Sequence, residues 1–170
     1  MGGMYLCPGS FRNVDVNAGL LADLGLAPTR RWLRDPWWYA AAFAALPVTL
    51  ALRAALGESV ESSARSAVFV LSFVVWQPLI EELLFRGVIQ GQLRTTRPGR
   101  WRKAGITGAN LIASLLFVLV HTVNHAPLWA IAVFVPSLVF GWMRDRHDSV
   151  YPALALHCAY NGLYLLVGLP

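Results

Sequence analysis

Long apolar stretches alternate with short polar connections along this chain. Five stretches stand out, at residues 37–56 with a single arginine, 66–80, 104–120, 127–143 and 149–169. Their lengths approach the roughly 20 apolar residues that a helix needs to cross a bilayer. They lack the two-residue alternation of barrel strands, and lipid leaves unpaired backbone groups unsatisfied. The pattern therefore predicts an all-α, polytopic integral membrane helix bundle of about five spanning helices.

The composition also favours a bilayer over an aqueous surface. Hydrophobic residues make up 56% of the 170-residue chain and charged residues 14%, whereas soluble domains carry about 25% charged residues. Mean hydropathy is +0.52. The net charge of +5 does not require nucleic acid, because cytoplasmic loops of membrane proteins collect Lys and Arg. We therefore expect the lipid bilayer as a partner, and no nucleic acid.

The basic residues predict an orientation. Eleven of the fourteen lie before the first stretch, between the second and third, or between the fourth and fifth. The alternate connections hold only Arg65. The positive-inside rule places the eleven on the cytoplasmic side, so the N-terminus is predicted to be cytoplasmic. In this interpretation residues 1–35 are a cytoplasmic lead-in and residues 36–170 form the membrane domain.

Polar groups interrupt three of the stretches, and ionisable residues inside a span indicate a functional site. The first group is Glu81, Glu82 and Arg86. Glu82 and Arg86 are four residues apart on a helix and can pair, whereas Glu81 points about 100° away around that helix. Pro78 lies just before them and is expected to break or kink the helix. An unpaired carboxylate that is partly removed from water suits a general base.

The other two groups each contain a histidine and a residue one helical turn away. Phe117 and His121 share a helix face, and His125 lies one turn further if that helix continues. His157 and Asn161 share a face in the middle of the last stretch. A carboxylate, two imidazoles and a carboxamide from three spans can activate a water and stabilise an oxyanion.

Each group alone has a plainer explanation. The two acids and the arginine can form a water-solvated helix end, and the histidines of the second group can lie at the membrane interface. His157 and Asn161 can make a hydrogen bond that only holds helices together. The combination of all three groups in one bundle favours a site.

The motifs in their order resemble a known family. They are EELLFR starting at Glu81, FVLVH ending at His121 and HCAYN starting at His157. This set is similar to the CPBP or Abi family, which comprises CAAX prenyl endopeptidases of type 2 and bacteriocin-processing proteins. The resemblance covers about residues 66–168, the expected catalytic core. It implies an intramembrane endopeptidase that cleaves a membrane-anchored peptide or protein in the bacterial cell (inner) membrane.

Two alternatives stay open at this point. A non-catalytic membrane scaffold or immunity protein of the same fold would bind its partner and cleave nothing. A haem-binding or proton-relaying bundle would use the histidines His121, His125 and His157 differently. The absence of internal repeats speaks against a transporter.

The resemblance also implies roles for individual residues. The catalytic residues would be Glu81, His121, His157 and Asn161, with Glu82 and Arg86 as supporting residues that orient the site. The first glutamate would deprotonate the attacking water, the first histidine would help to bind that water, and the second histidine and the asparagine would hold the oxyanion.

A zinc ion is the alternative to a glutamate-activated water. Glu81, His121 and His157 could supply three ligands with an open fourth position, and His125 could add or replace one. The chain has no HExxH motif, so it lacks the zincin arrangement. We slightly favour the glutamate-activated water without a metal.

One geometric conflict accompanies this assignment. At about 1.5 Å per residue, Glu81 lies some 22 Å from residue 66, near the cytoplasmic side. His121 lies about 25 Å from residue 104, near the opposite side. We expect either that Pro78 shifts the second helix or that the third helix starts later.

Overall fold

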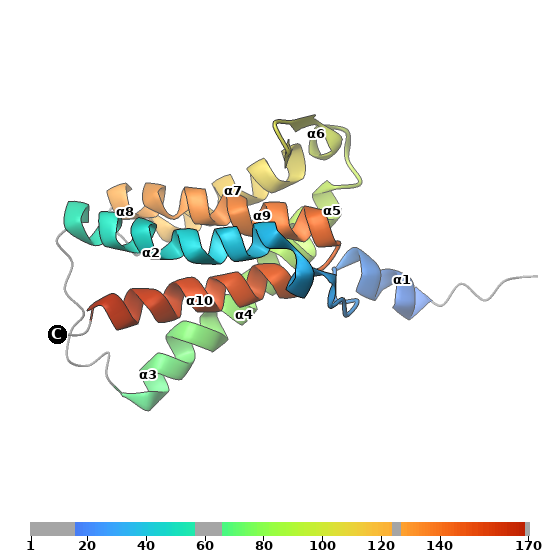
Figure 1. The fold of residues 1–170 in the computed structure, drawn as a ribbon. Helices are drawn as coiled ribbons and strands as arrows, with labels where there is room; N and C mark the ends of the chain where they lie inside the picture. Colours follow the sequence, from blue (N-terminus) through green and yellow to red (C-terminus); the bar gives the residue numbers. More distant parts are fainter. Residues whose placement is uncertain (1–15, 57–65, 124–126, 169–170) are drawn as a thin grey trace, which may run out of the picture.

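A computed structural model describes residues 16–56, 66–123 and 127–168. The fold is helical, apart from a hairpin of the two antiparallel strands β1 (Arg102–Lys103) and β2 (Ile106–Thr107). Each of the five apolar stretches contains helix, as Figure 1 shows. The all-α prediction is therefore confirmed.

The helices follow one another in short connections. The first are α1 (Val16–Asp23), the 3-10 helix η1 (Arg31–Arg34) and α2 (Pro36–Leu56). One continuous helix then runs through α3 (Ala67–Leu71), η3 (Ser72–Trp76), α4 (Gln77–Glu82), η4 (Leu83–Ile89) and α5 (Gln90–Leu93). The rest are α6 (Arg97–Arg100), α7 (Gly108–His121), α8 (Pro127–Ala132), α9 (Phe134–His147) and α10 (Tyr151–Gly168).

Two of these helices are long and apolar enough to cross a membrane, Ala67–Leu93 and Pro127–His147, within the described parts of the chain. The helix Gly108–His121 is apolar but shorter. Large apolar side chains face outward, and those of Phe43 and Val68 are 78% and 80% exposed. This apolar exterior fits lipid as its surroundings. The count of about five spans stays a prediction.

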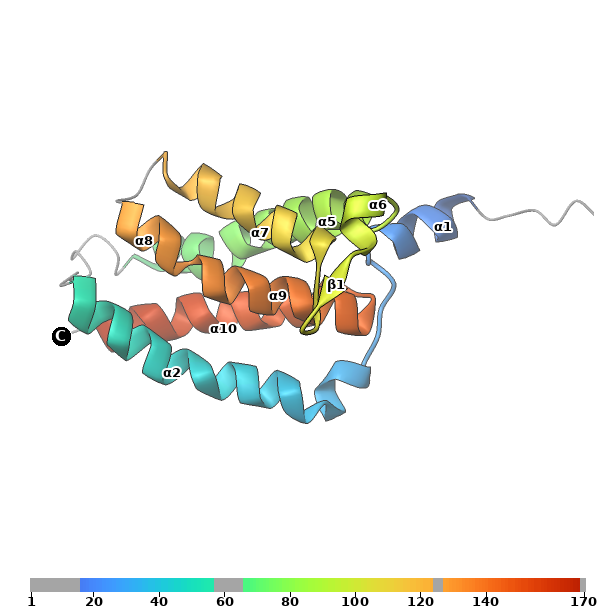
Figure 2. The same ribbon diagram turned by 90° about the horizontal axis from the view of Figure 1, so that it is seen from above.

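The last helix, α10, lies at the centre of the bundle. It packs against α2, α9 and the helix that contains η3 and α4, while α7 packs against α9 and η4 (Figures 1 and 2). The buried core between α9 and α10 consists of Phe140, Met143, Ala153 and Leu156. The central position of α10 brings His157 against the helix that carries both glutamates.

The expected break at Pro78 is absent, because the helix continues through it. Directly before it, η3 is a π-helical turn, and the N–H of Gln77 donates to the carbonyl of Ser72, five residues back. A second π-helical turn, η4, follows α4. Proline lacks the N–H that an α-helical ladder needs, and a wider turn is one way in which a helix accommodates such a gap. The π-helical turns therefore flank α4, which carries both glutamates.

Candidate functional site

His157 lies between two consecutive glutamates. Its Nδ1 donates to Oε1 of Glu82 over 2.9 Å, and its Nε2 lies 3.6 Å from Oε2 of Glu81. The Glu82 side chain is 1% exposed, whereas that of Glu81 is 28% exposed. One carboxylate is thus buried behind the imidazole, and the other opens toward a cavity.

Arg86 supports the buried carboxylate from the next helical turn. Its Nε lies 3.3 Å from Oε2 of Glu82, and neither side chain is more than 1% exposed. Its Nη2 donates to both the carbonyl and the hydroxyl of Ser137 on α9, at 2.9 and 2.7 Å. A buried carboxylate is tolerated only with such a partner, so the predicted pairing of Glu82 with Arg86 is confirmed.

His121 is the last residue of α7 and reaches the same region from the opposite wall. Its Nδ1 lies 2.8 Å from the carbonyl oxygen of Phe117, so Nδ1 donates, and Nε2 is an acceptor when the ring is neutral. The ring lies on Phe117, at 4.2 Å between centroids, and stacks with Trp129 at 6.0 Å. These contacts define the orientation of the imidazole.

Asn161 lies one turn beyond His157 on α10. Its Nδ2 donates to the carbonyl oxygen of Phe73 over 2.9 Å, and Phe73 belongs to the π-helical turn η3. This bond uses one of the two amide hydrogens, and the other is available for a ligand. Asn161 therefore both anchors η3 and faces the site.

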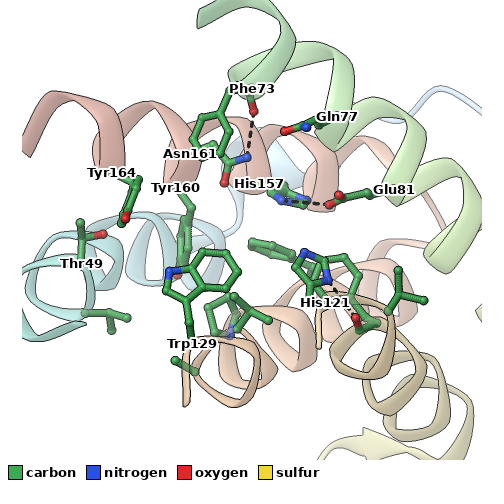
Figure 3. A pocket seen from close by; sticks show the side chains of 17 residues that line it. Thr49, Phe73, Gln77, Glu81, His121, Trp129, His157, Tyr160, Asn161 and Tyr164 are labelled. Atoms are coloured by element: carbon green, nitrogen blue, oxygen red, sulfur yellow. Dashed lines mark hydrogen bonds and ion pairs between the residues drawn. The ribbon is translucent and has the colours of Figure 1, made fainter. Parts of the chain in front are cut away.

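The four predicted catalytic side chains line one cavity of about 370 Å³ (Figure 3). In Figure 3 Glu81, His157 and Asn161 lie along one side of the cavity, and His121 lies on the opposite side. Glu82 does not line the cavity; it lies buried behind His157. The remaining polar or aromatic lining side chains are Thr49, Phe73, Gln77, Phe117, Trp129, Phe140, Tyr160 and Tyr164. His125 lies outside the described residues.

The expected conflict between Glu81 and His121 is resolved at both helices. The third helix starts at Gly108, four residues later than expected, because Thr107 caps it by accepting from the N–H of Asn110. Residues 102–107 form the hairpin instead. The second helix runs on to Leu93, which puts Glu81 at its middle rather than at its end.

Several contacts escaped the sequence interpretation. Ser137 is the lone small polar residue of the stretch 127–143, a signal that could have identified it as the partner of Arg86. The ring of Phe140 stacks on that of His157, with centroids 4.8 Å apart. No local signal marks Phe140, since one aromatic residue in an apolar helix resembles any other core residue.

The zinc hypothesis requires three converging ligands. Within the described ranges, no three His, Cys, Asp or Glu side chains form a group that could hold a metal ion. Glu81 and His157 are close enough to share one, and the third ligand, His121, stands apart from them on the other wall. A catalytic zinc needs three protein ligands, so the zinc set stays a prediction that this arrangement does not support.

Fold and site together define a class of protein, a membrane-embedded helical bundle with a buried carboxylate–histidine site. Residues 63–163 match the family of type II CAAX prenyl endopeptidase, Rce1-like, and the chain belongs to this family. Neither a curated protein nor a solved structure matches the chain. The family is one of membrane proteases, so the resemblance of the motifs is confirmed.

Proposed function

We propose that this protein is an intramembrane endopeptidase that cleaves a membrane-anchored peptide or protein by a water that Glu81 activates. The observation that carries the proposal is the placement of Glu81 against His157 on the wall of a cavity that His121 and Asn161 also line. Membership of a CAAX-type protease family supports the same reaction.

We assign complementary tasks to the two glutamates. Glu81 is partly exposed to the cavity and takes a proton from a water held there with the help of His121. The water oxygen then bonds to the scissile carbonyl carbon, and the oxyanion accepts from the amide of Asn161 and from Nε2 of His157, which donates when both ring nitrogens carry a proton. As the C–N bond breaks, Glu81 returns its proton to the leaving amine. Glu82 does not touch the substrate and instead orients His157.

The surroundings of the site favour a substrate that is itself held in the bilayer. The cavity lies inside a bundle with an apolar exterior, and Glu81 is at the middle of its helix. We infer that all five apolar helices span the bacterial cell membrane. Among the described residues, ten basic ones gather at the end where α2 and α10 begin and α5 and α9 end, which supports a cytoplasmic N-terminus. A prenylated tail, a leader peptide and a C-terminal tag with its own helix are the candidate substrates.

Cleavage by the purified full chain in detergent tests the proposal. Membrane-anchored peptides of the three kinds would be incubated with wild type and Glu81→Gln. Arg97→Gln, at an exposed position, serves as a matched control for activity that is lost through expression and purification of a variant. We expect wild type and the control to cleave, and Glu81→Gln to lose about 100-fold or more of the rate.

Equal cleavage by wild type and Glu81→Gln would overturn the assigned mechanism. A Glu81→Gln variant with full biological activity would favour the non-catalytic scaffold or immunity protein. An absorbance band in the visible range of the purified protein would favour the haem-binding alternative.

A further inference from the structure

A short N-terminal segment, residues 22–26, closes the end of the bundle at which η4 lies. Gly25 ends α1 with φ +70°, and its carbonyl accepts from the N–H of Val150 at 2.9 Å. Gly91 permits close backbone approach, because a Cβ there would lie 2.7 Å from the carbonyl oxygen of Asp23. The segment therefore packs directly on the helix that carries the glutamates.

Arg144 joins this segment to η4. The side chain comes from α9 and is 0% exposed. Its Nη2 donates to the carbonyl of Asp23 at 3.0 Å, and its Nε donates to the carbonyl of Arg86 at 3.3 Å. The carbonyl of Asp23 ends α1 and has no further helical donor. The carbonyl of Arg86 lies in the π-helical turn η4. Where the hydrogen bonds change from the π-helical to the α-helical pattern, one carbonyl is left without a backbone donor.

The same arrangement occurs at the other π-helical turn. The carbonyl of Phe73 in η3 accepts from Asn161 of α10, just as the carbonyl of Arg86 in η4 accepts from Arg144 of α9. A side chain from another helix thus anchors the π-helical turn on each side of α4. These anchors define the backbone from which Glu81 and Glu82 project.

We infer that Arg144 is a positioning residue and that segment 22–26 controls the geometry of the site through it. Arg144 holds the backbone of Arg86, Arg86 holds Glu82, and Glu82 holds His157 at 2.9 Å. Release of the segment loosens η4 and thereby the orientation of His157. The expected effect of the segment on catalysis rests on the proposed function, whereas its expected effect on the order of η4 does not.

Gly25→Ala tests the coupling without touching the cavity. An added Cβ would lie 2.5 Å from Nε of Arg144, at a φ that L residues avoid. Gly19→Ala is the matched control, since a Cβ at Gly19 meets nothing within 4 Å. Hydrogen–deuterium exchange of residues 83–91 and the kinetic constants for cleavage would be measured for both variants.

We expect Gly25→Ala to exchange faster in residues 83–91 and to lose about 2-fold to 30-fold in kcat with little change in KM. Gly19→Ala should match wild type in both. Arg144→Lys should retain more protection than Arg144→Met, because an ammonium can still donate to one carbonyl and a thioether has no donor. The two Arg144 variants also provide a second test if Gly25→Ala does not fold.

Equal exchange of residues 83–91 in Gly25→Ala, Gly19→Ala and wild type would overturn the inference. So would Arg144→Met with wild-type protection and wild-type kcat. The exchange measurement needs no substrate, so it can be read even if wild type cleaves nothing. Failure of the proposed function appears instead as equal cleavage by wild type and Glu81→Gln.

Discussion

Nδ1 of His157 lies 2.9 Å from Oε1 of Glu82, a carboxylate that is almost completely buried. This bond is made by only one of two consecutive glutamates, which therefore have different surroundings although they are the same residue type. Glu82 is enclosed by His157 and Arg86, and Glu81 opens to the cavity. The two acids should therefore respond differently to the same substitution.

Glu82→Gln should lower the stability of the fold, and Glu81→Gln should not. The amide at position 82 leaves the Arg86 charge buried without its partner, which costs about 3–5 kcal/mol. Glu81 is partly exposed, and its neighbour His157 keeps the hydrogen bond to Glu82 when Glu81 is replaced. Thermal unfolding of both variants in the same detergent measures the difference. Equal melting temperatures would contradict the buried role of Glu82.

Arg86→Lys should lose both stability and activity, because lysine cannot reproduce the planar fork of donors. Arg86 reaches Glu82 and two oxygens of Ser137 at once. Ser137→Ala is the milder comparison, since it removes only the hydroxyl acceptor and should cost about 0.5–1.5 kcal/mol. Chemical denaturation gives both values, and an Arg86→Lys variant as stable as Ser137→Ala would refute the prediction.

Metal removal should leave cleavage intact. The part of the chain that the structure describes brings no three metal-binding side chains together, and in the proposed mechanism Glu81 activates the water without a metal. Cleavage would be followed after dialysis against a chelator, with zinc added back in a parallel sample. Loss of cleavage in the chelator and its recovery with zinc would establish the zinc site instead.

Asp35 should make stability depend on acidity. The hydrogen bond from Arg146 holds the pKa of this carboxyl below its usual value of 3.8, while burial opposes that shift. His147 Nε2 also lies 3.0 Å from Asp35. A lowered folded-state pKa adds stability that is present above pH 3.8 and is lost as the pH falls through the folded value.

The melting temperature of wild type should therefore drop below about pH 4 more steeply than that of Asp35→Asn. Asp35→Asn is itself less stable near neutral pH, because it no longer pairs with Arg146. Parallel pH profiles for the two proteins would show that this carboxyl contributes nothing to the acid response.

Gly141→Ala should destabilise the contact between α9 and α7. A Cβ at Gly141 would lie 1.9 Å from Oδ1 of Asn110, whose own amide donates to the carbonyl of Leu138. Such overpacking costs about 1–3 kcal/mol. Gly162→Ala on α10 is the matched control, because its Cβ would meet Val74 at an ordinary 3.7 Å. Similar unfolding free energies for the two variants would contradict the prediction.

The sequence by itself determined the helices and the faces that carry the chemistry. Apolar runs and four-residue spacings are local features, and a helix converts them directly into a common face. The approximate positions of the five helices, the pairing of Glu82 with Arg86 and the shared face of His157 and Asn161 followed from that periodicity.

Only the tertiary structure decided which acid is buried and how the walls of the cavity meet. The contact of His157 with Glu82 joins residues 75 positions apart, and no local pattern encodes such a distance. The π-helical turns around α4 depend on donors from α9 and α10. The late start of α7 depends on a cap and a hairpin. Together these nonlocal contacts place Glu81, His121, His157 and Asn161 around one cavity.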